Sequence, residues 1–443
     1  MHTILWLERV LWSGPLFLGL MGSHIFFTVR LRGVQRLTGR GIMLSLQRDR
    51  GANGVSSFGA LATSLAAAIG TGNIIGIATA VALGGPGAVL WCWLTGVFGM
   101  ATRYAESYLS LRYRRQQPDG TAVGGPMYVM EDRLHMPRLA KCFAFLGIAA
   151  ALGTGSLIQA NAIGSALRTT ADVPLLFTGV AVTLLSALVI LGGVRSISSV
   201  CEKLVPTMSI LYLAGCCGVL WVNRALLPDT LVCIVSSAFS PKAAGGGFVG
   251  SSILSAARYG TARGLFTNES GMGTAPMAAA AGPCKHPAKE ALISMTGVFW
   301  DTVVICAMTG LVLVSSILQT PELFSQADVG SLCYLAFSLL PGGTWILTIS
   351  LVVFAFATIV GWCWYGEVCW GYLLGRHNLL LYRILYLAAA FLGVFGGLEL
   401  IWSLGSILAG LMTLPNLLCL WRLRQEVTAS LQTLAPGEKR LLF

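Results

Sequence analysis

Two glycine-rich interruptions mark the points in the apolar segments of this chain where a polar ligand could bind. The first interruption contains Gly70, Thr71, Gly72, Asn73 and Gly76. The second contains Gly245, Gly246, Gly247, Gly250, Ser251 and Ser252. Glycine weakens a helix, and a broken helix offers free N–H groups at one half-helix end and free carbonyls at the other. Such ends attract a carboxylate and an ammonium or sodium ion, so the pattern indicates a site for a zwitterion such as a small amino acid.

Close packing of neighbouring helices is the other ordinary reason for glycine in a membrane segment. The two interruptions, however, lie five apolar segments apart. That spacing is expected if two inverted repeats each begin with a discontinuous helix. We therefore predict one repeat over residues 51–225 and a second over 226–421, with an additional helix and basic loop in 1–50 and a cytoplasmic tail in 422–443.

A few further polar side chains lie inside the apolar segments. Asp301 is near the middle of its segment, where a carboxylate is costly and normally lines a pathway or pairs with a partner, so we predict a role in ion coupling or gating. Glu367 and Glu399 lie nearer segment ends, which favours structural or interfacial roles. Gln159 and Asn161 either join neighbouring helices by hydrogen bonds or contact the ligand.

The composition of the whole chain excludes a soluble protein. Only 11% of its 443 residues are charged, against about 25% in a typical soluble domain, and 55% are hydrophobic. A mean hydropathy of +0.76 is typical of an all-α polytopic membrane protein, whose helices satisfy their own backbone hydrogen bonds in lipid. The twelve cysteines form no Cys-x-x-Cys pair, the five histidines are scattered, and no phosphate loop or nucleophile motif occurs. We expect no enzyme activity.

Eleven apolar segments are long enough to cross about 30 Å of hydrocarbon, which takes roughly 20 helical residues. They span residues 5–29, 56–82, 86–110, 140–166, 173–194, 203–223, 230–258, 290–318, 343–374, 380–396 and 397–421. The first has an early Arg9 and lacks a clear small-residue cleavage site, so we expect an uncleaved helix rather than a signal peptide.

The basic residues predict the orientation in the membrane. The net charge of +11 arises from Lys and Arg in blocks between apolar segments, which indicates topology rather than nucleic-acid binding. With eleven spans, all but four of the 29 basic residues fall on one side. This side is the cytoplasm by the positive-inside rule, which places the N-terminus outside and the C-terminus inside.

The stretch 261–283 follows the seventh segment and is assigned to the cytoplasm by this topology. Its Asn268 and Glu269, between several glycines, fit an inner gate that opens and closes. A rigid connecting turn explains the same residues equally well. Both interpretations stay open at this point.

The motifs together resemble the alanine or glycine:cation symporter family of prokaryotic amino-acid carriers. In the first half the resemblance rests on Gly70-Thr-Gly-Asn-Ile-Ile-Gly-Ile-Ala-Thr-Ala80, Gly84-Gly-Pro-Gly-Ala88, Gly124-Gly-Pro-Met-Tyr128 and Gln159-Ala-Asn161. In the second half it rests on Arg263-Gly-Leu-Phe-Thr-Asn-Glu-Ser-Gly-Met-Gly-Thr-Ala-Pro276, Phe299-Trp-Asp301 and Trp362-Cys-Trp-Tyr-Gly-Glu367. These motifs occur in order along about 400 residues.

Membership would imply a LeuT-type inverted-repeat fold with one extra N-terminal helix. It would also imply sodium-coupled uptake of a small neutral amino acid in a bacterial plasma membrane, in some members with protons. The family pattern assigns the substrate to Thr71, Gly72, Asn73, Gln159, Asn161, Gly247, Ser251 and Trp362. Analogy with the shared fold assigns a sodium ion to the carbonyls of Ala66 and Ile69 and the hydroxyl of Thr358.

One residue departs from the family pattern at the implied ion site. The family usually carries a hydroxyl residue just before the threonine of this span, whereas the chain has Ala357. Loss of one oxygen would lower sodium affinity or leave a place for water. Proton coupling, passive facilitated transport and nutrient sensing are the alternatives to sodium symport. We expect the lipid bilayer and the amino acid as partners, with no nucleic acid and no obligate protein partner.

Overall fold

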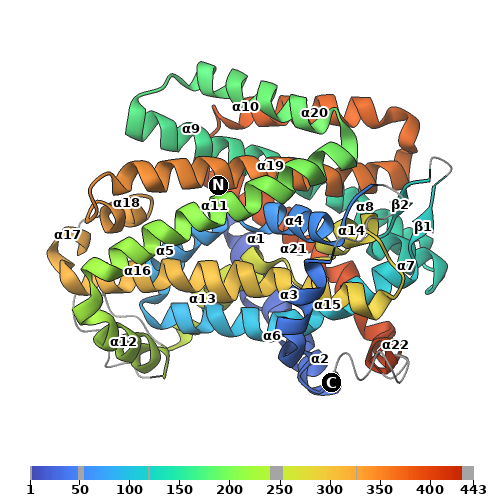
Figure 1. Ribbon diagram of the computed structural model, residues 1–443, viewed down its shortest axis with the longest axis horizontal. Helices are drawn as coiled ribbons and strands as arrows, with labels where there is room; N and C mark the ends of the chain where they lie inside the picture. Colours follow the sequence, from blue (N-terminus) through green and yellow to red (C-terminus); the bar gives the residue numbers. More distant parts are fainter. Residues whose placement is uncertain (1, 48–53, 118–119, 240–252, 326, 432–443) are drawn as a thin grey trace.

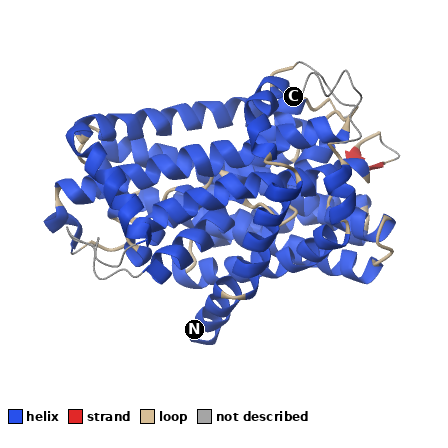
Figure 2. Cartoon of the chain, turned by 90° about the horizontal axis from the view of Figure 1, so that it is seen from below, coloured by secondary structure: helices blue, strands red, loops and turns tan. Residues whose placement is uncertain are grey.

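The computed structural model describes residues 2–47, 54–117, 120–239, 253–325 and 327–431 of the chain. These residues are almost entirely helical, and most of the long helices lie side by side along the longest axis of the molecule (Figure 1). Within the described ranges the strands form one two-stranded antiparallel sheet, β1 (Arg115–Gln116) with β2 (Ala122–Val123), in which Arg115 faces Val123 (Figure 2). The expectation of an all-α protein is confirmed, with this short hairpin as a minor exception.

The first half of the chain contains a broken helix followed by longer continuous ones. Its α-helices are α1 (His2–Ser13), α2 (Pro15–Arg30), α3 (Thr38–Ser45), α4 (Ser57–Ala68), α5 (Ile75–Gly84), α6 (Gly87–Arg112), α7 (Pro126–Asp132), α8 (Pro137–Ala150), α9 (Ile158–Ala171), α10 (Leu175–Ile190) and α11 (Gly193–Val222). A π-helical segment over 151–157 joins α8 to α9 without a break. The chain bends by 60° between α4 and α5, at the predicted first interruption.

The second half also combines long helices with a non-helical break, over residues 269–274. Its α-helices are α12 (Leu227–Phe239), α13 (Ile253–Asn268), α14 (Ala275–Ala281), α15 (Pro287–Val298), α16 (Ala307–Gln319), α17 (Pro321–Ser325), α18 (Leu332–Phe337), α19 (Gly343–Leu374), α20 (Leu379–Gly393), α21 (Leu398–Arg422) and α22 (Arg424–Ala429). A π-helical segment over 299–306 joins α15 to α16. Short 3-10 helices lie at Val34–Leu37, Thr71–Asn73, Arg224–Leu226 and Arg376–Asn378.

The stretch 261–283 begins inside a helix, and its cytoplasmic location stays a prediction. The helix α13 continues to Asn268, and Thr261, Thr267 and Glu269 are buried inside the protein. The predicted seventh segment ended at residue 258, because Arg258 and Arg263 interrupt the apolar run. One of them, Arg263, lies beside the Trp402 ring, with its guanidinium carbon 6.0 Å from the ring centroid. The predicted interruption at 245–252 lies outside the described residues.

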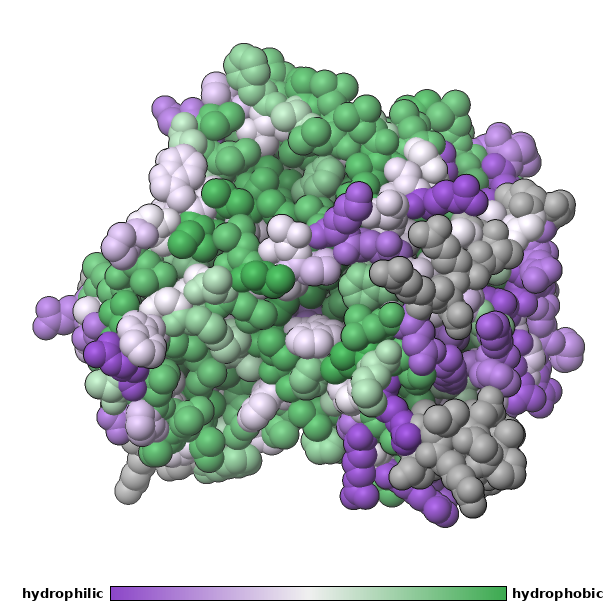
Figure 3. Space-filling view, in the orientation of Figure 1, coloured by the Kyte–Doolittle hydropathy of each residue, from purple (hydrophilic) through white to green (hydrophobic). Residues whose placement is uncertain are grey.

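The outer surface is suited to lipid rather than to water. Large apolar side chains such as Phe177, Leu188 and Leu380 are more than half exposed. Figure 3 shows apolar residues over much of the visible face. Six described helices are long and apolar enough to cross a membrane, and the bent pair α4–α5 makes a seventh. The protein is therefore a multi-pass membrane protein, while the number of eleven spans stays a prediction.

Helices α6 and α13 approach each other closely enough for their backbones to touch. A Cβ atom on Gly260 would lie 2.2 Å from the carbonyl oxygen of Ala88, and one on Gly264 would lie 2.0 Å from Thr95 Oγ1. Both glycines lie on α13, one helical turn apart, and they form the small-residue contact typical of membrane helices. This contact sets the position of the C-terminal end of α13.

We predict that Gly260→Ala destabilises the protein, because the added methyl group meets backbone that cannot move aside. Overpacking of this kind costs about 1–3 kcal/mol of the free energy of unfolding. The control is Gly22→Ala in α2, where no atom lies within 4 Å of the added Cβ. The measurement is the apparent melting temperature in detergent, which should fall for Gly260→Ala alone. Equal melting temperatures for the two variants would refute the close contact.

Candidate functional site

The two helix breaks meet at one small cavity inside the protein. Its volume is about 20 Å³, which is room for a water molecule or two. Residues from both breaks and from three continuous helices line it, namely Ala67, Ala68, Gly70, Gly72, Thr154, Gln159, Phe266, Thr267, Glu269, Met272, Thr358, Trp362 and Ala409. A ligand larger than water therefore requires movement of these walls.

The first break is held by hydrogen bonds to its own backbone. Gly70 is extended, and its N–H donates to Asn73 Oδ1 at 2.9 Å. The N–H of Thr71 points to Gln159 Oε1 at 3.4 Å, and the Thr71 hydroxyl is buried with no hydrogen-bond partner among the described residues. A Cβ on Gly72 would lie 2.8 Å from Thr267 Cγ2, so the two breaks are in direct contact. The break thus presents a free hydroxyl and a weakly bonded N–H near the cavity.

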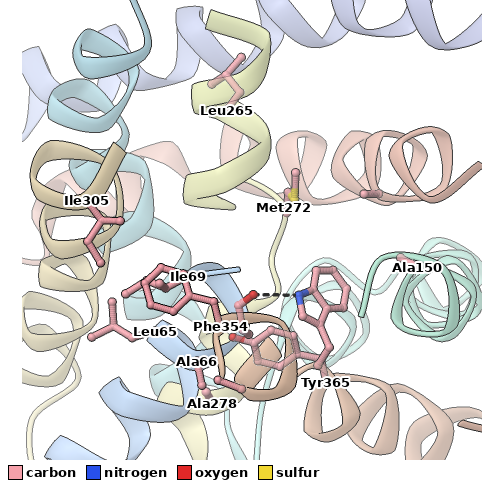
Figure 4. Close-up of a cluster of buried hydrophobic side chains, with 14 of the residues drawn as sticks. Leu65, Ala66, Ile69, Ala150, Leu265, Met272, Ala278, Ile305, Phe354 and Tyr365 are labelled. Atoms are coloured by element: carbon pink, nitrogen blue, oxygen red, sulfur yellow. Dashed lines mark hydrogen bonds between the residues drawn. The ribbon is translucent and has the colours of Figure 1, made fainter. Parts of the chain in front are cut away.

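The second break runs from Glu269 to Thr274, between α13 and α14. Glu269, Gly271 and Gly273 have positive φ angles of 53°, 88° and 81°, which no helix allows. The Glu269 carboxylate lines the cavity and accepts a hydrogen bond from the Thr274 hydroxyl at 2.7 Å. Figure 4 shows Met272 on this non-helical connection, below the end of α13.

Three oxygen atoms gather at the end of α4. The Thr358 hydroxyl on α19 lies 3.0 Å from the carbonyl oxygen of Ala66 and 3.3 Å from that of Ile69. Ala357 is completely buried beside it. In Figure 4, Ala66 and Ile69 lie close to Phe354, whose carbonyl also accepts from the Thr358 hydroxyl at 3.0 Å. Carbonyl and hydroxyl oxygens are the ligands that hard cations prefer, so these residues fit the sodium site implied by the sequence.

Trp362 closes one side of the cavity. Its indole N–H donates to the carbonyl oxygen of Ala67 at 3.2 Å, and only 1% of the residue is exposed. A Cβ on Gly155 would lie 2.3 Å from Trp362 Cβ, so the ring cannot retreat toward the π-helical segment. Gln159 is fixed nearby, since its Nε2 donates to the carbonyl oxygen of Thr154 at 3.2 Å. These contacts make Trp362 a rigid wall.

Asp301 contacts the first break from the π-helical segment between α15 and α16. Its Oδ1 accepts from Asn73 Nδ2 at 2.6 Å, and its Oδ2 accepts from the Thr302 hydroxyl at 2.7 Å. The residue is fully buried. Asp301 therefore lies next to the site, as expected of a membrane carboxylate, while its role in coupling or gating stays a prediction.

Other predicted residues lie elsewhere. Asn161 is absent from the cavity lining, and its Nδ2 donates to the carbonyls of Gly393 and Gly396 at 3.0 and 2.7 Å. These contacts join two helices, as the first interpretation of Asn161 expects, while its substrate-binding role stays a prediction. Asn268 ends α13, and its Oδ1 accepts from Ser270 N at 2.9 Å. Gly247 and Ser251 lie outside the described residues.

Glu367 also has a structural explanation. Its two carboxylate oxygens accept from Arg383 Nε at 2.6 Å and Arg383 Nη2 at 3.1 Å, which ties α19 to α20. The structural role expected for Glu367 is confirmed by this pairing. For Glu399, the side chain is outside what the structure describes.

Sequence reasoning did not assign Phe266, Thr267 or Met272 to the site. All three belong to a motif that the family resemblance had already included, around Asn268-Glu-Ser-Gly-Met-Gly273. The signal was available, because two glycines and an acidic residue within six positions break a helix as effectively as the glycines at 245–250. The break was not recognised, because the basic residues Arg258 and Arg263 suggested a loop in this part of the chain.

Comparisons with known proteins agree with this geometry. The chain is 44% identical to an uncharacterized transporter of Haemophilus influenzae over 425 residues, which is 95% of this chain and 93% of the relative. It is 41% identical to the sodium/alanine symporter AgcS of Methanococcus maripaludis over 416 residues, covering 92% and 91%. It is 34% identical to the probable sodium/glutamine symporter GlnT of Bacillus subtilis, covering 97% and 90%.

Among solved structures, a Na+-coupled sialic acid symporter in a substrate-bound, outward-open state superposes with a TM-score of 0.57. The superposition covers 88% of this chain and 86% of the symporter at 13% identity, so it shows a shared fold alone. The profile of the sodium:alanine symporter family matches residues 1–440. The resemblance drawn from the motifs is confirmed: the chain belongs to the sodium:alanine symporter family.

Proposed function

We propose that this protein is a secondary active transporter that carries a small neutral amino acid, alanine or glycine, together with sodium. The observation that carries the proposal is the convergence of two broken helices on one buried cavity beside the Thr358 oxygen cluster. Both breaks expose backbone groups to the same point, where a zwitterion can bind its carboxylate to N–H groups and its ammonium to oxygens.

Different residues would bind the carboxylate, the ammonium group and the sodium ion. In this proposal the N–H and hydroxyl groups of Thr71 and the backbone of the cavity-lining Gly72 bind the carboxylate, and Gln159 has its amide oxygen 3.4 Å from the Thr71 N. Glu269 supplies the negative charge that an ammonium group requires. Ala66, Ile69 and Thr358 would hold sodium, which when bound contributes a positive charge beside the substrate.

Alternating access would follow from movement of the helices around this fixed point. We propose that α4–α5 and α13–α14 open the two inverted repeats and that the N-terminus lies outside, with the C-terminus in the cytoplasm of a bacterial cell. Glu269 and Asn268 then act at a buried hinge of the second repeat, since neither residue lies on the surface.

Proton coupling is the second candidate, and a specific observation favours considering it. Asp301 and Glu269 are buried carboxylates that lie next to the site, and buried carboxylates in membrane proteins often take part in proton transfer.

The relatives differ in their named substrates, since one is named for alanine and another for glutamine. Both the ion and the amino acid therefore need a direct measurement.

The first prediction is uptake of labelled alanine into proteoliposomes above the external concentration when sodium enters down its gradient. Potassium in place of sodium is the control, and a proton gradient is the third condition. Accumulation driven by protons alone would make Asp301 or Glu269 the coupling group. Equilibration under every gradient would refute a symporter and leave a facilitator, whereas no uptake under any gradient would fit a sensor that binds without transport.

We predict that Trp362→Ala admits larger neutral amino acids, because its removal opens the rigid wall of the cavity. Inhibition of alanine uptake by unlabelled leucine and glutamine should become at least about tenfold stronger, a gain typical of one well-filled apolar pocket. Trp345→Ala on the same helix is the control, since Trp345 is 51% exposed. An unchanged inhibition profile would remove Trp362 from the substrate pocket.

We predict that Ala357→Ser lowers the half-saturating sodium concentration, because a serine hydroxyl beside Thr358 offers one more oxygen to the cation. The matched control is Ala355→Ser, which changes an equally buried alanine two positions away on α19. Uptake rates at a series of sodium concentrations provide the measurement. The same half-saturating value in Ala357→Ser and the wild-type protein would count against a sodium site at Thr358.

A further inference from the structure

A charged pair that does not line the cavity lies directly behind it. Arg103 and Glu106 are one turn apart on α6, with Arg103 Nε 3.4 Å from Glu106 Oε1. They are only 2% and 3% exposed. Removal of a charged group from water costs several kcal/mol per ion. A buried charged pair therefore calls for a structural or functional explanation. Neither residue is explained by the substrate and sodium sites.

Both side chains bind the backbone of the second break. The guanidinium of Arg103 donates to the carbonyl oxygen of Asn268, the last residue of α13. Glu106 Oε2 accepts from Gly271 N at 3.0 Å and from Gly273 N at 3.1 Å. A positive charge thus meets the free carbonyl at a helix C-terminus, and a negative charge meets N–H groups that no helix satisfies.

A third residue completes this arrangement. Asn416 on α21 donates through Nδ2 to Glu106 Oε2 at 3.1 Å and to the carbonyl oxygen of Gly271 at 2.8 Å. The break is therefore fixed from α6 on one side and from α21 on the other. Its residues Glu269 and Met272 line the cavity, so the position of the break sets the position of that wall.

The sequence relates Glu106 to Asp301 through the two breaks. Glu106 follows Asn73 by 33 residues, and Asp301 follows Asn268 by the same 33 residues. Each asparagine lies at a break, and each carboxylate lies on the next long helical element. Yet each carboxylate binds the break of the other half: Asp301 accepts from Asn73 at 2.6 Å, and Glu106 accepts from Gly271 and Gly273.

We infer that Glu106 and Asp301 are equivalent carboxylates that cross-brace the two broken helices, and that Glu106 with Arg103 is a positioning pair for the substrate site. The inference about substrate affinity rests on the proposed function, whereas the brace itself does not. Neutral acceptors would serve less well, since hydrogen bonds to a carboxylate are about twice as strong as those between neutral groups. The pair acts through the backbone of 269–274 and does not touch the substrate.

The test uses the full-length protein with Glu106→Gln, and with Glu106→Asp as the conservative variant that keeps the charge. Ser107→Ala is the matched control, because Ser107 is the next residue on α6 and bonds to Ser294 on α15 instead of to the break. Hydrogen–deuterium exchange followed by mass spectrometry is measured on the peptide over 268–274 and on a peptide from α10. Equilibrium binding of labelled alanine is measured on the same samples.

For Glu106→Gln we expect exchange of the 268–274 peptide to become about tenfold faster, as expected when charge-assisted hydrogen bonds are weakened. The α10 peptide should be unchanged, and the dissociation constant for alanine should rise by about tenfold, with partial recovery in Glu106→Asp. Ser107→Ala should match the wild-type protein in both measurements.

Two results would overturn the inference. Unchanged exchange of 268–274 in Glu106→Gln would refute the brace, whether or not alanine binds. Faster exchange with unchanged alanine affinity would make the pair a structural support only. If the wild-type protein binds no alanine, the proposed function fails, and the exchange measurement alone decides the brace.

Discussion

Backbone N–H and carbonyl groups cannot be left unpaired in lipid, and this constraint explains most of the interior of the protein. A transporter that binds its ligand with backbone must break two helices, and each break releases polar groups where no water replaces the lost hydrogen bonds. The polar side chains around the breaks satisfy these groups. Gly70 N is bonded to Asn73, the Asn268 carbonyl to Arg103, and Gly271 N to Glu106. The groups that remain available, such as the Thr71 hydroxyl, are the candidates for binding a ligand.

Much of the fold could be predicted from the sequence because hydrophobicity decides it. The eleven apolar segments all contain helix, and the break at 70–73 lies where the glycines placed it. The break at 269–274 was not predicted, because Arg263 interrupts the apolar run and suggests a loop, and no rule of composition shows that its charge lies beside an indole ring. Sequence alone also cannot show the π-helical segments, since the aromatic and β-branched residues over 299–306 are only moderate helix formers and do not distinguish a π-helix from an α-helix.

The candidate site was predictable in part for the same physical reason. Residues of the first break were proposed because glycines and polar residues stand out in an apolar run, whereas Thr358 was assigned to the ion site by the family resemblance. The glycines at 271 and 273 could have marked the second break, but Phe266 and Met272 look like any buried apolar residue, so only the fold assigns their side chains to the cavity. Asn161 shows the converse, because an amide inside a membrane helix satisfies carbonyls as readily as it binds a ligand.

The buried charges behind the site depend on the same contacts as the two helix breaks. A carboxylate in a region of low dielectric constant is costly unless a positive charge or hydrogen-bond donors face it. Arg103, Asn416 and the N–H groups of Gly271 and Gly273 supply these partners to Glu106. Asn73 and the Thr302 hydroxyl supply them to Asp301. The donors that a break releases therefore stabilise the carboxylates, and the carboxylates in turn stabilise the breaks, so neither feature would persist in a membrane without the other.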